Sequence, residues 1–211
     1  MSAAARKQLA ASDPTMAALM ARVGEIDLAT RLARRKEERP NDAYGALLRA
    51  IVGQQLSTKA ARTIYGRVLE LFDGSTPSPE RLLEAEESDL RGAGLSGRKV
   101  EYVRDLAAHV LSGELELDKL ETLSDEQVVA EITAVRGFGV WSAQMFLIFF
   151  LERPDVLPVG DLGIRNAVRA AYGLDAVPKP AELEAIGEPW RPFRTRASLY
   201  LWRSLENQPA V

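Results

Sequence analysis

The sequence predicts an all-α protein. Apolar residues recur at spacings of three and four along the chain, which is the period of one helix face, and no segment is typical of a strand. Ala, Leu, Glu and Arg dominate, and all four favour helices. The connections between periodic segments are brief, and neither a repeat nor a low-complexity linker divides the chain. We therefore expect a single compact helical unit over residues 1–211, built as two lobes from about ten short helices.

The expected helices of the first half begin at polar residues that cap helix N-termini. Asp13 is followed by Pro14 at the first helical position, and this helix runs to about Val23. Further helices are expected to begin after Asn41-Asp42, Ser57 and Ser78-Pro79.

The second half continues with a long helix over 98–111, which follows the glycine-rich break at 92–97. Ser124 and Gln127 have the spacing of a capping box for a helix that reaches Val135. The remaining helices are expected at 141–151, from Asp161 or Leu162 to about Tyr172, shortly after Pro180, and from Pro192 to about Glu206.

Composition excludes several kinds of site. The chain has no cysteine, which excludes disulfides, Cys-based zinc sites and a Cys-ligated iron–sulfur cluster. With one histidine, His109, a multi-His catalytic metal site is excluded too. The start of the chain lacks an apolar segment of signal-peptide length, and the longest apolar run, 145–151, is far too short to span a bilayer. We expect a cytoplasmic protein with no membrane partner.

The net charge of −3 argues mildly against a nucleic-acid partner, because phosphate neutralisation usually dominates such binding. The distribution of charge along the chain, in contrast, favours a nucleic-acid partner. Acidic residues gather at 80–89 and 114–131, whereas basic residues gather near the glycine-rich turns and at the end of the chain. These basic residues are Arg98, Lys99, Arg136, Arg165, Arg169, Arg191, Arg194, Arg196 and Arg203.

The hairpin Gly137-Phe138-Gly139 joins two apolar helices. Such a hairpin leaves backbone N–H groups unpaired at the N-terminus of the second helix, and these groups and the helix dipole suit a phosphate oxygen. A Gly-x-Gly sequence also serves simply as a tight turn between helices. Its position between two well-formed helices favours the phosphate interpretation.

An apolar loop after the second of these helices leads to one carboxylate, Asp161. An Asp at the start of a helix is usually an N-cap. Its apolar neighbours favour a partly buried carboxylate, and such carboxylates are frequent at functional sites. These neighbours are Leu157, Pro158, Val159, Leu162 and Ile164.

Two tryptophans and one interhelix turn have open interpretations. Trp141 and Trp202 either belong to the core or both face a cleft, where they would form a slot for a planar ring with Met145 one turn beyond Trp141. The turn Gln54-Gln55-Leu56-Ser57 is either a polar connection or presents side chains that fill a space in a base stack.

Together these motifs resemble the helix-hairpin-helix DNA glycosylase superfamily, and within it the 3-methyladenine-DNA glycosylase II (alkylbase DNA glycosylase) family. Besides 135–169, the stretches that carry the resemblance are 51–61 (IVGQQLSTKAA), 94–103 (GLSGRKVEYV) and 190–202 (WRPFRTRASLYLW). The resemblance covers about 41–205. It implies a two-lobed fold with the active site in the cleft between lobe one, about 45–136, and lobe two, about 1–44 with 137–211.

The resemblance also implies roles for single residues. Asp161 matches the catalytic aspartate. The base pocket would contain Trp141, Met145, Leu162 and Trp202. DNA would be contacted by Gln54, Gln55, Leu56, Ser57, Lys99, Gly137, Phe138 and Gly139, with the wedge into the duplex near Gln55 or Leu56. A structural Na⁺ or K⁺ would bind the backbone carbonyls of Thr133, Val135 and Phe138; no other cofactor is expected.

We therefore expect a monomeric, monofunctional glycosylase that hydrolyses the N-glycosidic bond of alkylated bases, such as 3-methyladenine and 7-methylguanine, in double-stranded DNA. Bifunctional relatives place a catalytic lysine two residues after the second hairpin glycine, and Trp141 occupies that position here. Lyase activity is therefore not expected. The alternative is a non-catalytic helix-hairpin-helix module that binds DNA structure, which needs the hairpin and the basic residues but not Asp161.

Overall fold

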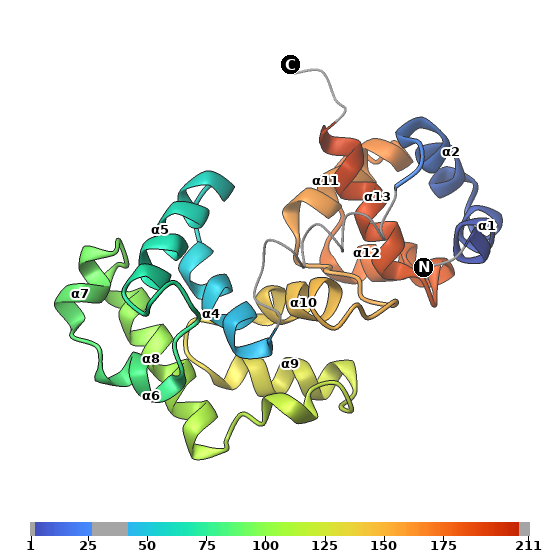
Figure 1. The fold of residues 1–211 in the computed structure, drawn as a ribbon. Helices are drawn as coiled ribbons and strands as arrows, with labels where there is room; N and C mark the ends of the chain where they lie inside the picture. The colour runs from blue at the N-terminus through green and yellow to red at the C-terminus, as the bar shows by residue number, and fades with distance from the viewer. Residues whose placement is uncertain (1–2, 27–41, 207–211) are drawn as a thin grey trace. The chain divides into compact units, whose positions relative to one another are not determined.

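The computed structural model describes residues 3–26 and 42–206 of the 211-residue chain. Every regular element in those two ranges is a helix, so the all-α prediction is confirmed for the part that the structure describes (Figure 1). None of the described helices is long and apolar enough to cross a membrane. Asn41, which was expected to take part in a helix cap, lies outside the described residues.

The chain divides into two compact units. Unit 1 comprises Met1–Arg34 with Leu147–Val211, and unit 2 comprises Arg35–Phe146. The division falls inside helix α10 (Val140–Phe149), whereas the sequence placed the boundary between its two lobes near residue 136.

Unit 2 contains α4 (Ala43–Gly53), α5 (Thr58–Glu70), α6 (Pro79–Glu84), α7 (Glu87–Gly92), α8 (Gly97–Ser112), the 3₁₀ helix η1 (Leu117–Lys119) and α9 (Asp125–Ala134). The long helix α8 is its centre and packs on α4, α6 and α7 (Figure 1). The buried side chains of α8 are Val100, Val103, Leu106 and Ala107.

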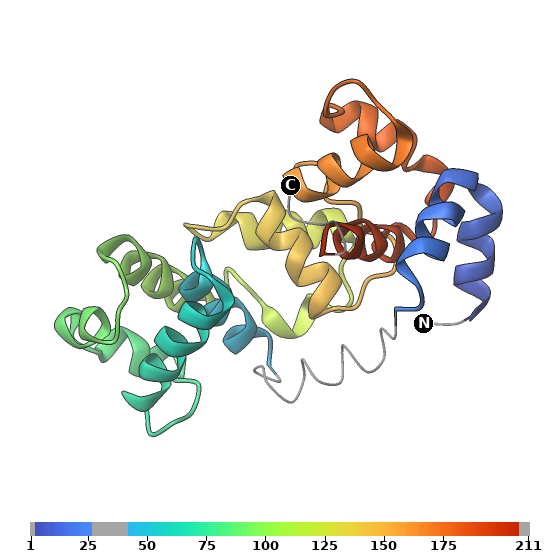
Figure 2. The same ribbon diagram turned by 90° about the horizontal axis from the view of Figure 1, so that it is seen from above.

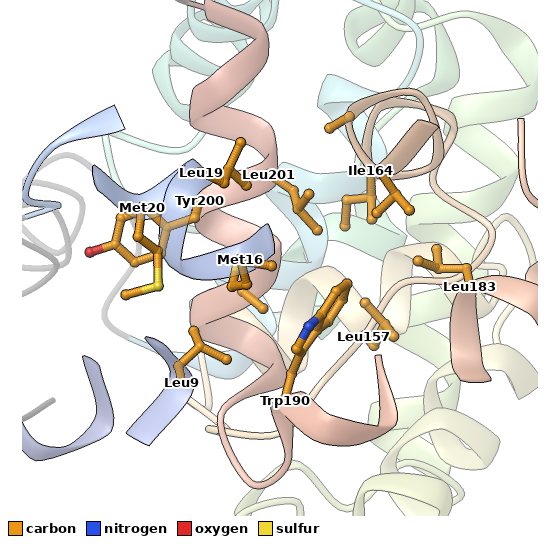
Figure 3. Packing of buried hydrophobic residues seen from close by; sticks show 13 residues of the cluster. Leu9, Met16, Leu19, Met20, Leu157, Ile164, Leu183, Trp190, Tyr200 and Leu201 are labelled. Carbon is orange, nitrogen blue, oxygen red and sulfur yellow. The ribbon is translucent and has the colours of Figure 1, made fainter. Parts of the chain in front are cut away.

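Unit 1 contains α1 (Ala3–Ser12), α2 (Pro14–Val23), α11 (Leu162–Tyr172), α12 (Pro180–Ile186), the 3₁₀ helix η2 (Glu188–Trp190) and α13 (Arg194–Glu206). Helix α13 packs on α11 and α2, and Figure 2 shows α13, in red, beside α2, in blue. Trp190 is fully buried, in one cluster with Met16, Leu157 and Ile164 (Figure 3). The core of unit 1 therefore joins helices from both ends of the sequence.

The predicted helix caps are confirmed. Four predicted caps accept a backbone hydrogen bond from the first turn of their helix: Asp13, Asp42, Ser57 and Ser78. The capping box also forms, because Gln127 N donates to Ser124 Oγ at 3.3 Å and Ser124 N donates to Gln127 Oε1 at 2.9 Å. Each cap satisfies an amide that the helix itself leaves without a partner.

Asp13 does more than cap α2. Its Oδ1 accepts from Thr15 N at 2.8 Å and Met16 N at 3.0 Å, while its Oδ2 accepts from Trp190 Nε1 at 2.8 Å and from the Tyr172 hydroxyl. Burial alone raises the pKa of the Asp13 carboxyl, but these four hydrogen bonds outweigh it and hold that pKa below its ordinary value. The carboxylate therefore links α2 to α11 and η2.

Two of the described α-helices have no counterpart among those expected from the sequence. Helix α1 buries Ala5 and Leu9 but lacks a continuous apolar stripe, and α7 has six residues with no side-chain capping bond from Glu86. The last helix begins at Arg194 rather than at Pro192. Arg191 is extended, with ψ 142°, which is the conformation that a residue before proline favours.

Candidate functional site

Asp161 lies at the N-terminus of α11, where it is half-buried. Its Oδ1 accepts hydrogen bonds from Ile164 N at 2.8 Å and from Trp202 Nε1 at 3.1 Å. The carboxylate is therefore an N-cap and also the partner of an indole on another helix. Donors from α11 and α13 together hold the carboxylate. An N-cap needs only the donor from its own helix.

The apolar loop before Asp161 is anchored to the same helix that carries Trp202. Val156 and Pro158 are buried, and Asp161 N donates to Pro158 O at 2.9 Å. Val156 N donates to Thr195 Oγ1 at 3.0 Å, and Thr195 lies on α13. One helix thus positions both the loop that carries the carboxylate and the indole that binds it.

Trp202 is half-buried at the edge of the unit 1 core. Its ring stacks on Phe149 with the ring centroids 6.0 Å apart and the planes 26° apart. Phe149 was not among the residues predicted for the base pocket. It follows Met145 by four residues, the spacing of one helix face, and that spacing is the signal by which it could have been found.

Two residues after Asp161 differ in their exposure. Leu162 has 61% of its surface exposed, although it is a large apolar residue. Gly163 faces inward: an added Cβ would lie 3.0 Å from Asp161 Oδ1 and 3.6 Å from Trp202 Cδ1. A side chain at Gly163 would therefore press on the hydrogen-bonded pair. Sequence reasoning missed this glycine: its contact with Asp161 is local, but its contact with Trp202 depends on how α13 packs.

Trp141 is not a core residue. It is 49% exposed on the first turn of α10, next to Val140, which is 56% exposed. Met145, one turn later, is half-buried. Two large apolar side chains exposed side by side next to a glycine hairpin are suited to contact with a ligand.

The hairpin, residues 135–139, uses its two glycines differently. Gly137 has φ +90°, and a Cβ there would lie 2.4 Å from Tyr102 Cδ2, so both its backbone conformation and its packing require glycine. Gly139 is exposed, and a Cβ there would meet nothing within 4 Å. Phe138, between them, is buried. The hairpin is therefore closed on the side of Gly137 and accessible at Gly139.

Gln54 and Lys99 were expected to contact DNA, and in the structure both direct hydrogen bonds into the protein. Gln54 Nε2 donates to Gly137 O at 2.8 Å. Lys99 Nζ donates to Val52 O at 2.6 Å and to Gln54 O at 2.9 Å. Burial lowers the pKa of the Lys99 ammonium.

The other residues of the α4–α5 loop, residues 54–57, lie nearer the surface. Gln55 is exposed and has φ +57°. Leu56 is half-buried, and Ser57 is exposed with its Oγ accepting from Ala60 N at 3.3 Å. Gln55 and Ser57 are therefore the exposed residues of this loop, and the Ser57 hydroxyl is engaged as the cap of α5.

The carbonyls expected to bind a monovalent cation lie at the carboxyl end of α9 and in the hairpin. The last carbonyls of a helix lack intrahelical partners and suit a cation. Val135 O accepts from Phe138 N at 3.3 Å, so this carbonyl already has one partner within the hairpin. In the two described ranges, no group of three or more His, Asp or Glu side chains could hold a metal ion.

The predicted site residues fall into two groups. Asp161, Leu162 and Trp202 belong to unit 1, whereas Trp141, Met145, the hairpin, the α4–α5 loop and Lys99 belong to unit 2. Within unit 1 the structure brings Asp161 to Trp202, and within unit 2 it brings the α4–α5 loop to the hairpin. The cleft that the sequence placed between two lobes stays a prediction.

Comparison with known proteins gives the family of this site. A family model described as "HhH-GPD superfamily base excision DNA repair protein" matches residues 48–192. The chain is 36% identical over 169 residues to the "Putative DNA-3-methyladenine glycosylase YfjP" of Bacillus subtilis, which covers 77% of this chain and 59% of that protein. It is 35% identical over 165 residues to "DNA-3-methyladenine glycosylase 1" of Schizosaccharomyces pombe, covering 77% of this chain and 72% of that protein.

Solved structures of similar proteins share the fold. The S. pombe 3-methyladenine DNA glycosylase (Mag1) in complex with abasic DNA matches with a TM-score of 0.80 and 31% identity over 98% of both chains. A DNA-3-methyladenine glycosidase from Bacillus halodurans matches with a TM-score of 0.83 and 36% identity, over 96% of this chain and 89% of that one.

Proposed function

Since the chain belongs to the HhH-GPD superfamily of base excision DNA repair proteins, we propose that it is a monofunctional DNA glycosylase. It would act as a monomer on double-stranded DNA and hydrolyse the N-glycosidic bond of alkylated bases of the 3-methyladenine and 7-methylguanine type. The observation that carries the proposal is Asp161, a carboxylate held by two donors from two helices. The names of the similar glycosylases support the substrate class.

The target nucleotide has to leave the base stack, because its glycosidic bond is inaccessible inside a duplex. Extrusion costs a few kcal/mol, which contacts with the rest of the duplex must offset. Gln55, exposed in the α4–α5 loop, would fill the vacated space. The amides of the hairpin near Gly139, where nothing obstructs approach, would bind a phosphate of the same strand.

A purine alkylated on a ring nitrogen carries positive charge and is a good leaving group. Such a base needs little help from a general acid, so the proposed mechanism lets the Asp161 carboxylate stay ionised. Its charge favours contact with the faces of Trp141 and Trp202, worth about 0.5–2 kcal/mol for each ring.

Departure of the base leaves positive charge on the sugar. The Asp161 carboxylate would stabilise this oxocarbenium-like centre and orient the attacking water. The hydrogen bonds from Ile164 N and Trp202 Nε1 fix the carboxylate before the substrate arrives, so little reorganisation is needed in the transition state.

The absence of lyase activity is the second part of the proposal. Trp141 occupies the position of the catalytic lysine in bifunctional relatives, and an indole cannot form a Schiff base with the sugar. We also propose that the carbonyls of Thr133, Val135 and Phe138 bind a structural Na⁺ or K⁺. Such an ion would hold the hairpin in shape and would take no part in the bond cleavage.

The test is base release from DNA that has been treated with a methylating agent, and from duplexes that each carry one lesion such as ethenoadenine or hypoxanthine. We expect release of free 3-methyladenine or 7-methylguanine, and strand breaks only after alkali. Borohydride should trap no protein–DNA adduct. DNA binding without any base release would favour the non-catalytic module, and strand breaks without alkali would contradict the monofunctional assignment.

A further inference from the structure

Three side chains of α8 contact two backbone segments of unit 2, the end of α4 and the hairpin, to which Arg136 belongs. Lys99, Tyr102 and Asp105 follow one another at a spacing of three residues, so they share one side of the helix. Lys99 contacts the end of α4, and the ring of Tyr102 packs against Gly137. Asp105 Oδ2 accepts from Arg136 N at 2.8 Å. One side of one helix thus holds both the α4–α5 loop and the hairpin.

The ammonium group of Lys99 binds backbone carbonyls of the protein itself. Its ammonium donates to Val52 O at 2.6 Å and to Gln54 O at 2.9 Å, at the carboxyl end of α4. The last carbonyls of a helix lack intrahelical partners, and the helix dipole favours a cation there. Arg98, its neighbour in sequence, is exposed and makes no such contact in the described structure. The two adjacent cations therefore differ in what they bind.

Gln54 is held at both ends. Its backbone carbonyl accepts from Lys99 Nζ at 2.9 Å, and its side-chain Nε2 donates to Gly137 O at 2.8 Å. Its own backbone N donates to Ile51 O at 3.2 Å, which closes the last turn of α4. Gln55 follows directly, exposed and with φ +57°. The position of Gln55 relative to the hairpin is therefore set by Lys99 and Gln54.

We propose that Lys99 and Gln54 are positioning residues that hold Gln55 in register with the hairpin, so that the wedge and the phosphate-binding amides act on the duplex as one rigid part. This inference rests on the proposed function. A loop that is already ordered loses little conformational freedom when DNA binds, and the binding energy is left to drive base extrusion. Lys99 then aids extrusion without touching the DNA.

The closing experiment compares two substrates that differ only in the cost of extrusion. A lesion in a fully paired duplex must be unstacked and unpaired, whereas the same lesion in a short mismatched bubble is already loosened. Single-turnover excision is measured with enzyme in excess, for the wild type, Lys99→Met and Lys99→Arg. The methionine keeps most of the side chain's length and removes the ammonium, and the arginine restores two donors.

We expect Lys99→Met to slow excision from the paired duplex about tenfold or more and to affect the bubble far less. Lys99→Arg should recover most of the rate. The salt dependence of binding to undamaged duplex should stay as in the wild type. The matched control is Arg98→Met, which removes a charge from the same helical turn: it should leave the paired-to-bubble ratio unchanged, whatever it does to the salt dependence.

A different pattern would overturn the inference. If Lys99→Met slows both substrates equally and lowers the slope of log affinity against log salt by about 0.9, Lys99 is a phosphate contact instead. If Lys99→Met does not fold, Gln54→Leu provides the test, because it keeps the backbone carbonyl and removes the bond to Gly137. Equal slowing of both substrates by Gln54→Leu would also reject the inference.

One further readout separates this inference from the proposed function. A duplex with 2-aminopurine beside the lesion reports unstacking by fluorescence, with no bond cleaved. If the wild type unstacks the base but releases none, the proposed function fails while the inference is still tested by the fluorescence of Lys99→Met. Unstacking by Lys99→Met equal to that of the wild type would reject the positioning role.

Discussion

Replacing Asp161 with Asn removes the charge of the side chain but keeps its hydrogen bonds. Asn is also a good N-cap, and its amide oxygen can accept the same two hydrogen bonds, from Ile164 N and Trp202 Nε1. We therefore expect Asp161→Asn to fold and to bind undamaged DNA like the wild type, while single-turnover excision falls about a hundredfold or more. Excision at the wild-type rate would remove Asp161 from the mechanism.

Gly163 provides a second test of the Asp161 carboxylate, because a side chain at this position would crowd the carboxylate without changing its charge. In Gly163→Ala the new methyl lies 3.0 Å from Asp161 Oδ1, so the carboxylate or the methyl has to shift. Alanine favours a helix over glycine by about 0.5–1 kcal/mol, so the melting temperature should hold or rise while excision falls. The matched control is Gly66→Ala in α5, where nothing lies within 4 Å of the added carbon. Gly66→Ala should change the melting temperature and leave excision unchanged. Equal excision rates for Gly163→Ala and Gly66→Ala would contradict the role of Gly163.

At the scale of single residues, the sequence indicates the site only where the signal is local. Asp161 was predicted because a cap and its apolar neighbours lie together in the chain. Its bond to Trp202 and the closeness of Gly163 to Trp202 were not predictable, because both depend on how α13 packs on α11. The exposure of Trp141 was likewise open, since an apolar helix has no sequence mark for the face that remains in solvent.

At the scale of elements, the two hairpin glycines should fail in different ways. Gly137→Ala has to adopt φ +90° and brings its Cβ to 2.4 Å from Tyr102, so we expect a loss of stability of about 1–3 kcal/mol. Gly139→Asp adds a charge at an open position. It should fold normally and weaken binding to all duplexes, damaged or not. Urea unfolding and binding at moderate salt measure the two effects.

Either variant could contradict this division. A Gly137→Ala protein as stable as the wild type would mean that Tyr102 moves away at no cost. A Gly139→Asp protein with unchanged affinity would mean that the hairpin does not touch DNA.

Helix starts with a capping side chain were predictable, and contacts between helices were not. Ser124 and Gln127 form their capping box because both partners lie within one turn. The alignment of Lys99 and Tyr102 with two separate loops has no comparable signal, because those loops are far away in the sequence. Helix α1 was missed for a third reason: its apolar residues are nearly all alanine and do not gather on one face, so they give no clear period.

At the scale of the whole molecule, Asp13 makes the stability of unit 1 depend on pH. The pKa of its carboxyl in the folded state lies below the ordinary value of about 3.9, which the unfolded chain retains. The stabilisation is therefore complete above about pH 4 and is lost as the pH falls through the folded-state pKa. In Asp13→Asn, an amide group replaces the oxygen that accepts from Trp190 Nε1, leaving a buried donor without a partner at a cost of about 1–3 kcal/mol.

Urea unfolding of the wild type and Asp13→Asn at about pH 7 and about pH 3 measures this effect. The gap in unfolding free energy should be largest at the higher pH and shrink at the lower one. A gap of equal size at both pH values would show that the Asp13 charge contributes nothing. Asp42→Asn, an exposed cap with no buried indole partner, is the control and should show a smaller gap.

The fold class was predictable for the whole molecule, because the helical period is present in nearly every segment. The division of the chain into units was only partly predictable. Two lobes were expected, but the packing of α2 on α13 joins segments that share no local signal. Which helices pack together depends on the shape and burial of their side chains in the folded core, and no local pattern in a single sequence indicates it.

Unit 1 takes its helices from both ends of the chain, and this sets an order for synthesis on the ribosome. Helix α2 emerges before all of unit 2, whereas its partners α11 and α13 are translated after it. At roughly 5–20 residues per second, the apolar face of α2 waits about 10–40 s for them, a period in which chaperones can bind it. The indole that holds the Asp161 carboxylate also arrives with α13. A nascent chain therefore completes the helices of unit 2 before the carboxylate that we propose as catalytic has its indole partner.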